Sequence, residues 1–155
     1  LSRGLGDVYK RQIMKLIIIN GPNLNLLGIR EKNIYGKTSF DSYYETLIKK
    51  YNGKVDLEYY QSNHEGELIE KIQKIGFSYD GIIINAGGFT HTSVALRDAI
   101  SSVTTPAIEV HISNILSREE FRKKSYLSDV CTGIISGLGL MGYEAAINYF
   151  SEKND

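Results

Sequence analysis

The 155-residue sequence is poor in several residue types, and each shortage excludes a class of protein. A single cysteine, Cys131, excludes an internal disulfide framework and a cysteine-based metal cluster, and we interpret it as a reduced structural thiol. Eighteen basic and eighteen acidic residues cancel to a net charge of zero, and no basic stripe indicates a nucleic-acid partner. No apolar run approaches the roughly 20 residues that span a bilayer. This composition suits a protein of the cytoplasm.

The first thirteen residues differ from the remainder of the chain. Leu1 to Ile13 are mostly polar and show no hydrophobic period, whereas an apolar run starts directly after Met14. A signal peptide would need an apolar central region, which this segment lacks. We therefore predict that residues 1–13 are a foreign leader, tag or artefact and that residues 14–155 form a single domain.

The chain from Met14 onward alternates short apolar runs with helical patterns. The runs at about 15–20, 55–61, 81–85, 107–113 and 133–136 are predicted strands. Helical patterns cover about 39–51, 65–76, 93–102 and 143–151, with a short helix at 118–124. Strands that alternate with helices in this way predict right-handed parallel crossovers. We therefore expect an α/β fold, a flavodoxin-like doubly wound sheet of five parallel strands with helices on both faces.

The predicted strand 107–113 carries polar residues on one face. Glu109, His111 and Ser113 alternate with Ile108, Val110 and Ile112, so the two sets point to opposite faces. One explanation is a polar pocket floor at the carboxyl edge of the sheet, where open α/β sheets bind ligands. There Glu109 would orient His111 and favour its protonated form for general acid catalysis. The alternative is an edge strand with a solvated face.

The segment after the first strand, Gly21 to Lys37, is long for a strand-to-helix loop and is typical of a lid or binding loop. It holds Arg30 and Tyr35, and a nearby arginine favours the ionised form of a tyrosine. A tyrosinate could act as a base toward a carbon acid beside a ketone, although ordinary packing is the alternative for Tyr35. The segment Arg118–Arg122 is either a solvated helix start or the source of an arginine that binds a carboxylate.

Two further patterns give only weak indications. Gly137–Gly142 has the glycine spacing of a dinucleotide-binding turn, but only 13 residues follow it, too few for a second strand with a ribose-binding acid. We interpret it as a tight turn with close helix–sheet packing. His64, His91 and His111 lack the spacing of a metal site. The glycine turn keeps open a second function, a non-catalytic flavodoxin-like module that binds a small anion or flavin phosphate.

Four separated motifs resemble those of type II 3-dehydroquinate dehydratases. They are Asn20–Gly28 with Arg30-Glu31 and Tyr35-Gly36, then Asn85–Ser93, Ile108–Asn114 and Arg118–Arg122. The resemblance runs from Met14 to the last helix. One departure is Lys32, where many members of the family carry proline after Arg-Glu. This change removes no chemical group from the motif.

The resemblance implies a dehydration of 3-dehydroquinate to 3-dehydroshikimate without a metal or other cofactor, in the shikimate pathway or in quinate breakdown. Tyr35 would remove a proton from C2, and Arg30 would stabilise the charge that develops in the enolate. His111, oriented by Glu109, would protonate the departing C1 hydroxyl. Asn23 would hold a water near the enolate oxygen.

The resemblance also implies a set of substrate-binding residues and an assembly. Asn85, His91 and Arg122 would bind hydroxyl groups of the substrate. Ile112 and Ser113 would bind its carboxylate. Asp98 would reach the site of a neighbouring subunit, because members of the family assemble as trimers grouped into homododecamers.

Overall fold

The apolar runs form the five strands of one parallel sheet, as the alternation of strands and helices predicts. The computed structural model describes residues 13–153. The strands are β1 (Met14–Asn20), β2 (Val55–Gln61), β3 (Gly81–Asn85), β4 (Ala107–His111) and β5 (Gly133–Ser136). Their order is β2-β1-β3-β4-β5, and every pairing is parallel. This is the order of a flavodoxin-like doubly wound sheet, so the predicted fold class is confirmed.

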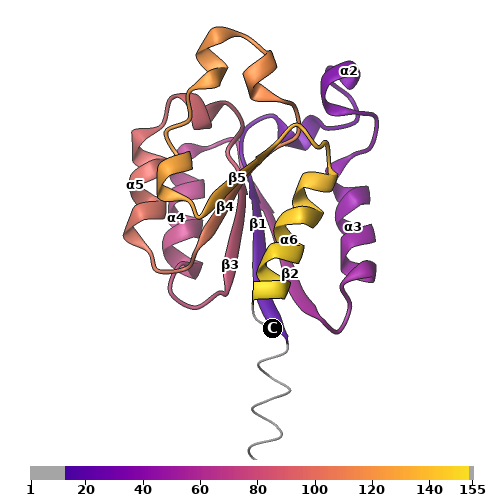
Figure 1. The fold of residues 1–155 in the computed structure, drawn as a ribbon, viewed down its shortest axis with the longest axis vertical. Coiled ribbons are helices and arrows are strands. Elements are labelled where there is room, and N and C mark those ends of the chain that lie inside the picture. Colours follow the sequence, from indigo (N-terminus) through magenta and orange to yellow (C-terminus); the bar gives the residue numbers. More distant parts are fainter. Residues whose placement is uncertain (1–12, 154–155) are drawn as a thin grey trace, which may run out of the picture.

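Helices cover both faces of this sheet (Figure 1). On one side lie α3 (Phe40–Lys50) and α6 (Met141–Lys153), and on the other lie α4 (Glu65–Ile75) and α5 (Val94–Ser102). Side chains alternate between the two layers along β1, since Ile18 packs in the core with α3 and α6 while Ile17 and Ile19 pack with α4 and α5. The three central strands β1, β3 and β4 are therefore buried on both faces, and ligands can reach them only at the strand ends.

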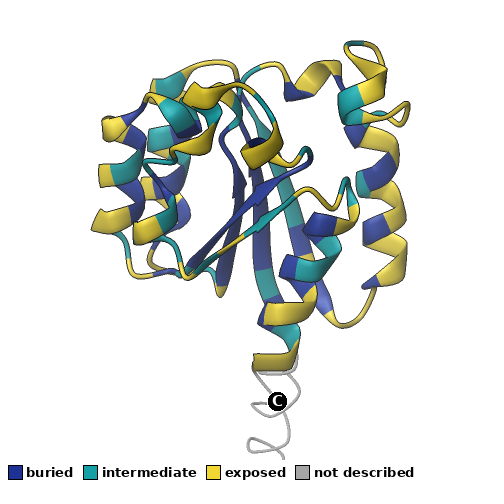
Figure 2. Cartoon of the chain, turned by 45° about the horizontal axis from the view of Figure 1, so that its top comes forward, coloured by how far each residue is buried: buried dark blue, intermediate teal, exposed yellow. Residues whose placement is uncertain are grey.

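The strand β4 corrects one of the sequence interpretations. It lies between β3 and β5 and all five of its residues are buried, so the alternative of an edge strand with a solvated face is wrong. Figure 2 shows the buried strands between helices whose outer surfaces are exposed. The strand ends at His111, two residues before the predicted end, and Ile112 and Ser113 belong to the loop that follows. The polar residues Glu109 and His111 thus lie inside the protein.

The segment between β1 and α3 contains two short turns of helix. These are a 3₁₀ turn, η1 (Leu24–Leu26), and α2 (Lys32–Tyr35), which lies above the carboxyl ends of the strands (Figure 1). Each turn begins after a residue in the left-handed region, Asn23 with φ 69° and Glu31 with φ 43°. Left-handed backbone is uncommon outside glycine. Here each of the two residues is the N-cap of a short helical turn, and the second turn, α2, carries Tyr35.

The other connections at this end of the sheet are also short helical turns. They are η2 (Gly87–His91) after β3, then η3 (Ile115–Ser117), η4 (Glu120–Lys123) and η5 (Ser128–Val130) between β4 and β5. The chain then turns from β5 into α6 through Gly137, whose φ is 90°. This conformation explains the glycine there and confirms the prediction of a tight turn.

The ends of β1 and β3 approach each other closely. The backbone N–H of Gly21 donates a hydrogen bond to the carbonyl of Asn85, at 2.7 Å. A Cβ atom at Gly21 would lie 2.4 Å from the carbonyl oxygen of Ala86. Only glycine therefore allows the two strand ends to come together at this point.

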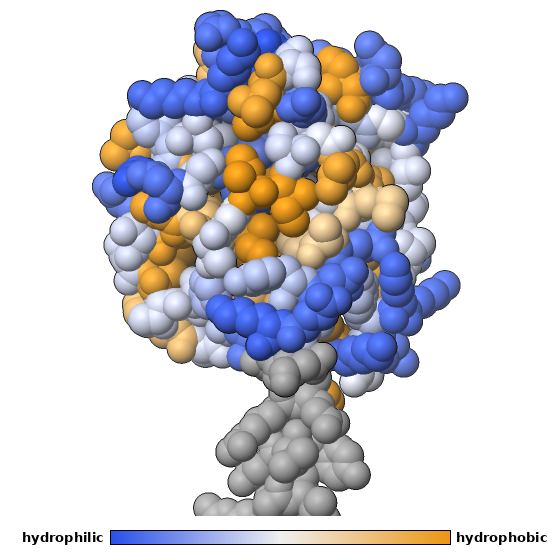
Figure 3. Space-filling model, viewed as in Figure 1, coloured by the Kyte–Doolittle hydropathy of each residue, from blue (hydrophilic) through white to orange (hydrophobic). Residues whose placement is uncertain are grey.

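Four further predictions or features of the chain can be compared with the structure. Burial, together with the charges of Glu109 and Asp129, raises the pKa of the half-buried Cys131 thiol to about 12, as suits a structural thiol. No helix among residues 13–153 is long and apolar enough to cross a membrane. Figure 3 shows apolar side chains gathered on one face of the molecule. The predicted foreign leader covers residues 1–13, and residues 1–12 lie outside the described part of the chain.

Candidate active site

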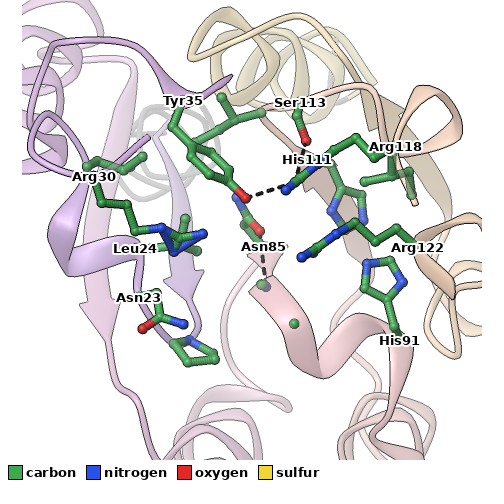
Figure 4. Close-up of a pocket in the computed structure, with 16 residues that line it drawn as sticks. Asn23, Leu24, Arg30, Tyr35, Asn85, His91, His111, Ser113, Arg118 and Arg122 are labelled. Carbon is green, nitrogen blue, oxygen red and sulfur yellow. Dashed lines mark hydrogen bonds between the residues drawn. The ribbon is translucent and has the colours of Figure 1, made fainter. Parts of the chain in front are cut away.

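A hollow opens at the carboxyl ends of β1, β3 and β4. The residues around it come from four connections: the segment after β1, the turn η2 after β3, the loop after β4, and η4 (Figure 4). Its lining includes many residues predicted from the sequence: Asn23, Arg30, Tyr35, Asn85, His91, His111, Ile112, Ser113 and Arg122. These lining residues follow the ends of several strands and converge on one pocket, as expected at the carboxyl ends of a parallel sheet.

A buried carboxylate lies behind His111. Glu109 is fully buried, and its Oε2 is hydrogen bonded to Nε2 of His111. Burial alone would raise the pKa of Glu109, but hydrogen bonds from His111, Ser128 and Ser125 and the charge of His111 outweigh it and hold that pKa below its usual range. Glu109 is therefore a carboxylate that fixes the orientation of the His111 ring.

The hydroxyl of Tyr35 faces this histidine side of the pocket from α2. It accepts a hydrogen bond from Nη1 of Arg118, at 2.8 Å (Figure 4). The guanidinium carbon of Arg30 lies 4.7 Å from the centre of the Tyr35 ring, and that of Arg118 lies 5.4 Å away. Two guanidinium groups beside one phenol can stabilise negative charge that develops there during a reaction. The arrangement can therefore produce a base on the lid segment.

Arg118 is a residue that sequence reasoning missed. The sequence motif Arg118–Arg122 predicts only Arg122 in the site, and the sequence predicts Arg30 alone beside the tyrosine. In the structure both Arg118 and Arg122 line the pocket, and Arg118 also donates to Oγ of Ser113, at 3.1 Å. Arg118 has extended backbone after η3, whereas Arg122 lies on η4, so a helical spacing of the two arginines does not explain why both reach the pocket.

Asn85 is held from behind by a tyrosine. Its Nδ2 donates to the hydroxyl of Tyr143, at 2.9 Å, and its Oδ1 accepts from the backbone N–H of Gly87, at 3.2 Å. The hydroxyl of the fully buried Tyr143 in turn donates to Oδ1 of Asn20, at 2.9 Å. These bonds use half of the hydrogen-bonding capacity of the Asn85 amide. One N–H and one lone pair remain for a ligand in the pocket.

His91 has a different character from His111. Its Nδ1 donates to the backbone carbonyl of Lys124, at 2.7 Å, because a carbonyl can only accept. Burial lowers the pKa of His91, and the positive charges of His111 and Arg122 act in the same direction. The ring lies 6.3 Å from that of His111 and nearly parallel to it. His91 is therefore a neutral group whose Nε2 can accept a hydrogen bond from a ligand hydroxyl.

The last two predicted residues lie at the borders of the pocket or outside it. The backbone N–H of Asn23 is held by Oδ1 of Asn63, at 3.0 Å, and Asn23 lines the side opposite Arg122 (Figure 4). Asp98 is exposed on α5 and is not among the lining residues. Its predicted role requires a second subunit and stays a prediction.

The groups in the pocket suit acid–base chemistry on a polar, anionic molecule. A tyrosine activated by arginine and a histidine held by a carboxylate share one hollow with guanidinium and amide groups. No group of three or more His, Cys, Asp or Glu side chains within residues 13–153 is placed to hold a metal ion. Fold and site together define a doubly wound α/β protein with a candidate general acid and a candidate general base at the carboxyl ends of its strands.

The pattern of the family described as "Dehydroquinase class II" matches residues 14–151, and the chain belongs to this family. A 3-dehydroquinate dehydratase of Polynucleobacter necessarius is 58% identical over 134 residues, which are 85% of this chain and 90% of that protein. One of Fusobacterium nucleatum is 54% identical over 144 residues, which are 90% of this chain and 97% of that protein.

Solved structures agree with the sequence comparison. The crystal structure of a type II dehydroquinase from Butyrivibrio crossotus superposes with a TM-score of 0.85 at 51% identity. The match covers 88% of this chain and 97% of that one. The family resemblance and the fold class expected from the sequence are thus both confirmed.

Proposed function

We propose that this protein removes water from 3-dehydroquinate to give 3-dehydroshikimate by anti elimination, with Tyr35 as the base and His111 as the acid. Membership of the class II dehydroquinases supports the reaction, since the relatives carry the name 3-dehydroquinate dehydratase. The observation that carries the two roles is the geometry of one pocket. An arginine-bound tyrosine hydroxyl faces it from the lid segment, and a carboxylate-bound histidine faces it from β4.

In the first step the ionised Tyr35 takes a proton from C2 of the substrate. The electrons of the broken C–H bond form an enolate with the adjacent C3 ketone, so that negative charge moves from the tyrosine oxygen to the substrate. Arg30 and Arg118 lie beside the tyrosine and stabilise the anionic state throughout. Asn23 would hold a water at the enolate oxygen.

In the second step the enolate re-forms the ketone and expels the hydroxyl from C1. The C1–O bond breaks while His111 transfers its proton to the departing oxygen, so that water leaves and a C1–C2 double bond remains. Glu109 stays charged and stabilises the imidazolium before this transfer. Overall a proton moves from C2 to the leaving hydroxyl, and proton exchange with solvent restores Tyr35 and His111.

The other residues of the pocket would position the substrate. Asn85, His91 and Arg122 offer an amide, a neutral imidazole and a guanidinium to its hydroxyl groups. Ile112 and Ser113, at the end of β4, would bind the carboxylate. This binding holds the C2 proton toward Tyr35 and the C1 hydroxyl toward His111 on opposite faces of the ring, as an anti elimination requires.

We further propose a homododecamer in the cytoplasm that serves the shikimate pathway, and so the formation of chorismate and aromatic amino acids. In such an assembly Asp98 would reach the pocket of a neighbouring subunit from its exposed place on α5. Assembly would also cover apolar side chains that the single chain leaves exposed around β5, namely Ile134, Leu138 and Met141. Light scattering on the chain from Met14 onward tests the size of the assembly.

A spectrophotometric assay with 3-dehydroquinate tests the reaction. The product has an enone conjugated with a carboxylate, so the ultraviolet absorbance rises as it forms. We expect the same rise after addition of a chelator and after borohydride pretreatment, because enolate chemistry on these side chains needs neither a metal nor an imine. Folded protein without any rise would contradict the proposal and favour the module that binds a small anion or flavin phosphate.

A further inference from the structure

Burial of the Glu109 carboxylate costs free energy, because it removes a charged group from water. Glu109 lies on the fourth strand of a sheet that is covered on both faces, and none of its surface is exposed. An ionised carboxylate out of contact with water is costly unless its oxygens accept hydrogen bonds. His111 supplies one donor. The remaining donors come from a part of the chain that the reaction described above does not use.

Two serine hydroxyls complete the shell around Glu109. Oγ of Ser128 donates to Oε1, at 2.6 Å. Oγ of Ser125 lies 2.9 Å from Oε2 and 3.1 Å from Oε1, so its proton bridges the two carboxylate oxygens. Both serines lie between η4 and β5, 16 and 19 residues after Glu109 in the sequence. Each oxygen of the carboxylate thus faces a hydroxyl donor.

The hydroxyl of Ser125 has its direction fixed by the backbone. Its oxygen accepts hydrogen bonds from the N–H groups of Leu127, at 3.1 Å, and Ser128, at 3.2 Å. Two accepted bonds occupy both lone pairs of a hydroxyl oxygen, so that only its proton remains. Ser125 therefore donates to Glu109 and cannot accept from it. A donor that cannot reverse its role favours the ionised form of the carboxylate over the protonated form.

The serine segment is itself anchored to α5. Nη1 of Arg97 donates to the carbonyl of Tyr126, at 2.8 Å, and its guanidinium forms a two-point ion pair with Asp129, one contact of which measures 3.0 Å. Leu127, between these contacts, is fully buried in the core on the α4 and α5 side. The hydroxyls are thus held in place by residues on three sides and do not depend on a ligand.

We propose that Ser125 and Ser128 are positioning residues for the acid of this reaction: they keep Glu109 ionised and aligned, and through it keep His111 protonated and aimed at the substrate. The proposal rests on the function proposed above. Neither serine lines the pocket, so each acts only through the carboxylate. This distinguishes them from Ser113, which faces the ligand directly.

The predicted effect of losing a serine hydroxyl has a definite sign. The Glu109 carboxylate is less stabilised without it, so the proton shared by Glu109 and His111 spends more time on Glu109, and the rate falls. The form with the proton on Glu109 contains no carboxylate and is not weakened, whereas the pair that has lost this proton is, so as that form becomes populated the pair loses its proton only at higher pH. The neighbouring groups are His91 on η2, Arg122 on η4 and Cys131 after η5. All three are unchanged by the substitution.

Ser128→Ala is the decisive variant, because the hydroxyl of Ser128 bonds only to Glu109, whereas Ser125 also closes a backbone turn. A hydrogen bond to a charged group contributes enough that its loss should lower kcat about tenfold or more. The alkaline fall of the kcat profile should move to higher pH while the acid fall, which reports the base, stays in place. Ser128→Thr keeps the hydroxyl and should restore both properties. Ser78→Ala removes an exposed hydroxyl between α4 and β3 and is the matched control.

A nuclear magnetic resonance titration of the His111 ring separates this proposal from the assignment of the reaction. In Ser128→Ala the midpoint of the His111 chemical-shift change should lie at higher pH than in the unaltered protein, whether or not 3-dehydroquinate is the substrate. If the unaltered protein does not turn over 3-dehydroquinate, the proposed function fails and the titration still tests the serines. An unchanged midpoint in folded Ser128→Ala, or a rate loss that is equal at every pH, would overturn the positioning role.

Discussion

The two walls of the pocket are built in opposite ways. The lid wall, residues 21–37, presents Tyr35 from a single turn of helix, half-exposed, with one donor on its hydroxyl. The strand wall, β4 with the segment up to residue 130, presents His111 at 5% exposure against a carboxylate that three side chains bind. The proposed base on the long segment can rely on the charge of nearby arginines, which acts over several ångströms, whereas the proposed acid is buried and needs directed hydrogen bonds at fixed distances.

Tyr35→Phe tests the lid wall with the largest expected effect. The substitution keeps the ring beside the two arginines and removes only the oxygen that takes the proton in the proposed reaction. Because general base catalysis contributes about 10²–10⁴-fold, kcat should fall by a factor in that range while the circular dichroism spectrum is unchanged. Tyr44→Phe, which removes a hydroxyl bonded to the carbonyl of Leu57 outside the pocket, is the control. Near-native turnover by Tyr35→Phe would show that the base is another group.

Glu109→Gln tests the strand wall with the next largest effect. The amide keeps the shape of the side chain but removes the charge that favours protonated His111, so we expect kcat to fall by about 10–100-fold. The alkaline fall of activity should move to lower pH, since the imidazolium loses its carboxylate. This shift is opposite in sign to that expected for Ser128→Ala. A profile that moves in the same direction in both variants would refute the account of the wall given above.

Arg118→Met connects the two walls, since this arginine follows β4 in the sequence and donates to the base. Loss of the cation disfavours the ionised form of Tyr35, so the acid fall of activity should move to higher pH, with kcat at neutral pH about tenfold lower. Lys123→Met, which removes an exposed cation paired with Glu120 on η4, should leave the profile unchanged. If the acid side of the pH–activity profile of Arg118→Met is unchanged, Arg30 alone stabilises negative charge on Tyr35.

Tyr143→Phe tests the region between the walls with the smallest expected effect. The hydroxyl of Tyr143 joins Asn20 to Asn85, and both amides are buried. Because its loss leaves buried polar groups unpaired, the free energy of unfolding should fall by about 1–3 kcal/mol, measured by urea denaturation. KM should rise more than kcat falls, since the proposed role of Asn85 is to bind substrate and not to transfer a proton. A fall in kcat at unchanged KM would assign Asn85 to the chemistry.

The sequence predicted the sheet well because its strands are short, apolar and bounded by polar residues. It placed the end of β4 too late, since Ile112 continues the apolar alternation. The pairing of β4 with β5 nevertheless ends at His111 and Ser136, because the chain turns away from the sheet at Gly137. The end of β4 depends on where β5 ends, and the residue pattern of β4 alone carries no information about that, so this boundary could not be predicted from the sequence.

The site was predictable as far as its residues follow strand ends or match the family motifs. The contacts of Arg118 with Tyr35 and of the two serines with Glu109 were not. The serines lie in a polar segment with no hydrophobic period, and only the anchoring of that segment by Arg97 brings them to β4. Such contacts depend on how separate elements pack, which the spacing of residues along the chain does not encode.

The close approach at Gly21 has a consequence for the spacing of the two walls. One wall leaves the sheet from the end of β1, and the turn η2 beside the other leaves from the end of β3. The gap between these ends admits a hydrogen atom and no carbon, since a Cβ at residue 21 would meet the Ala86 carbonyl at 2.4 Å. A single methyl group there, as in Gly21→Ala, would push the ends of β1 and β3 apart. It would carry the segment that holds the base away from the rest of the pocket without changing one side chain that touches the substrate.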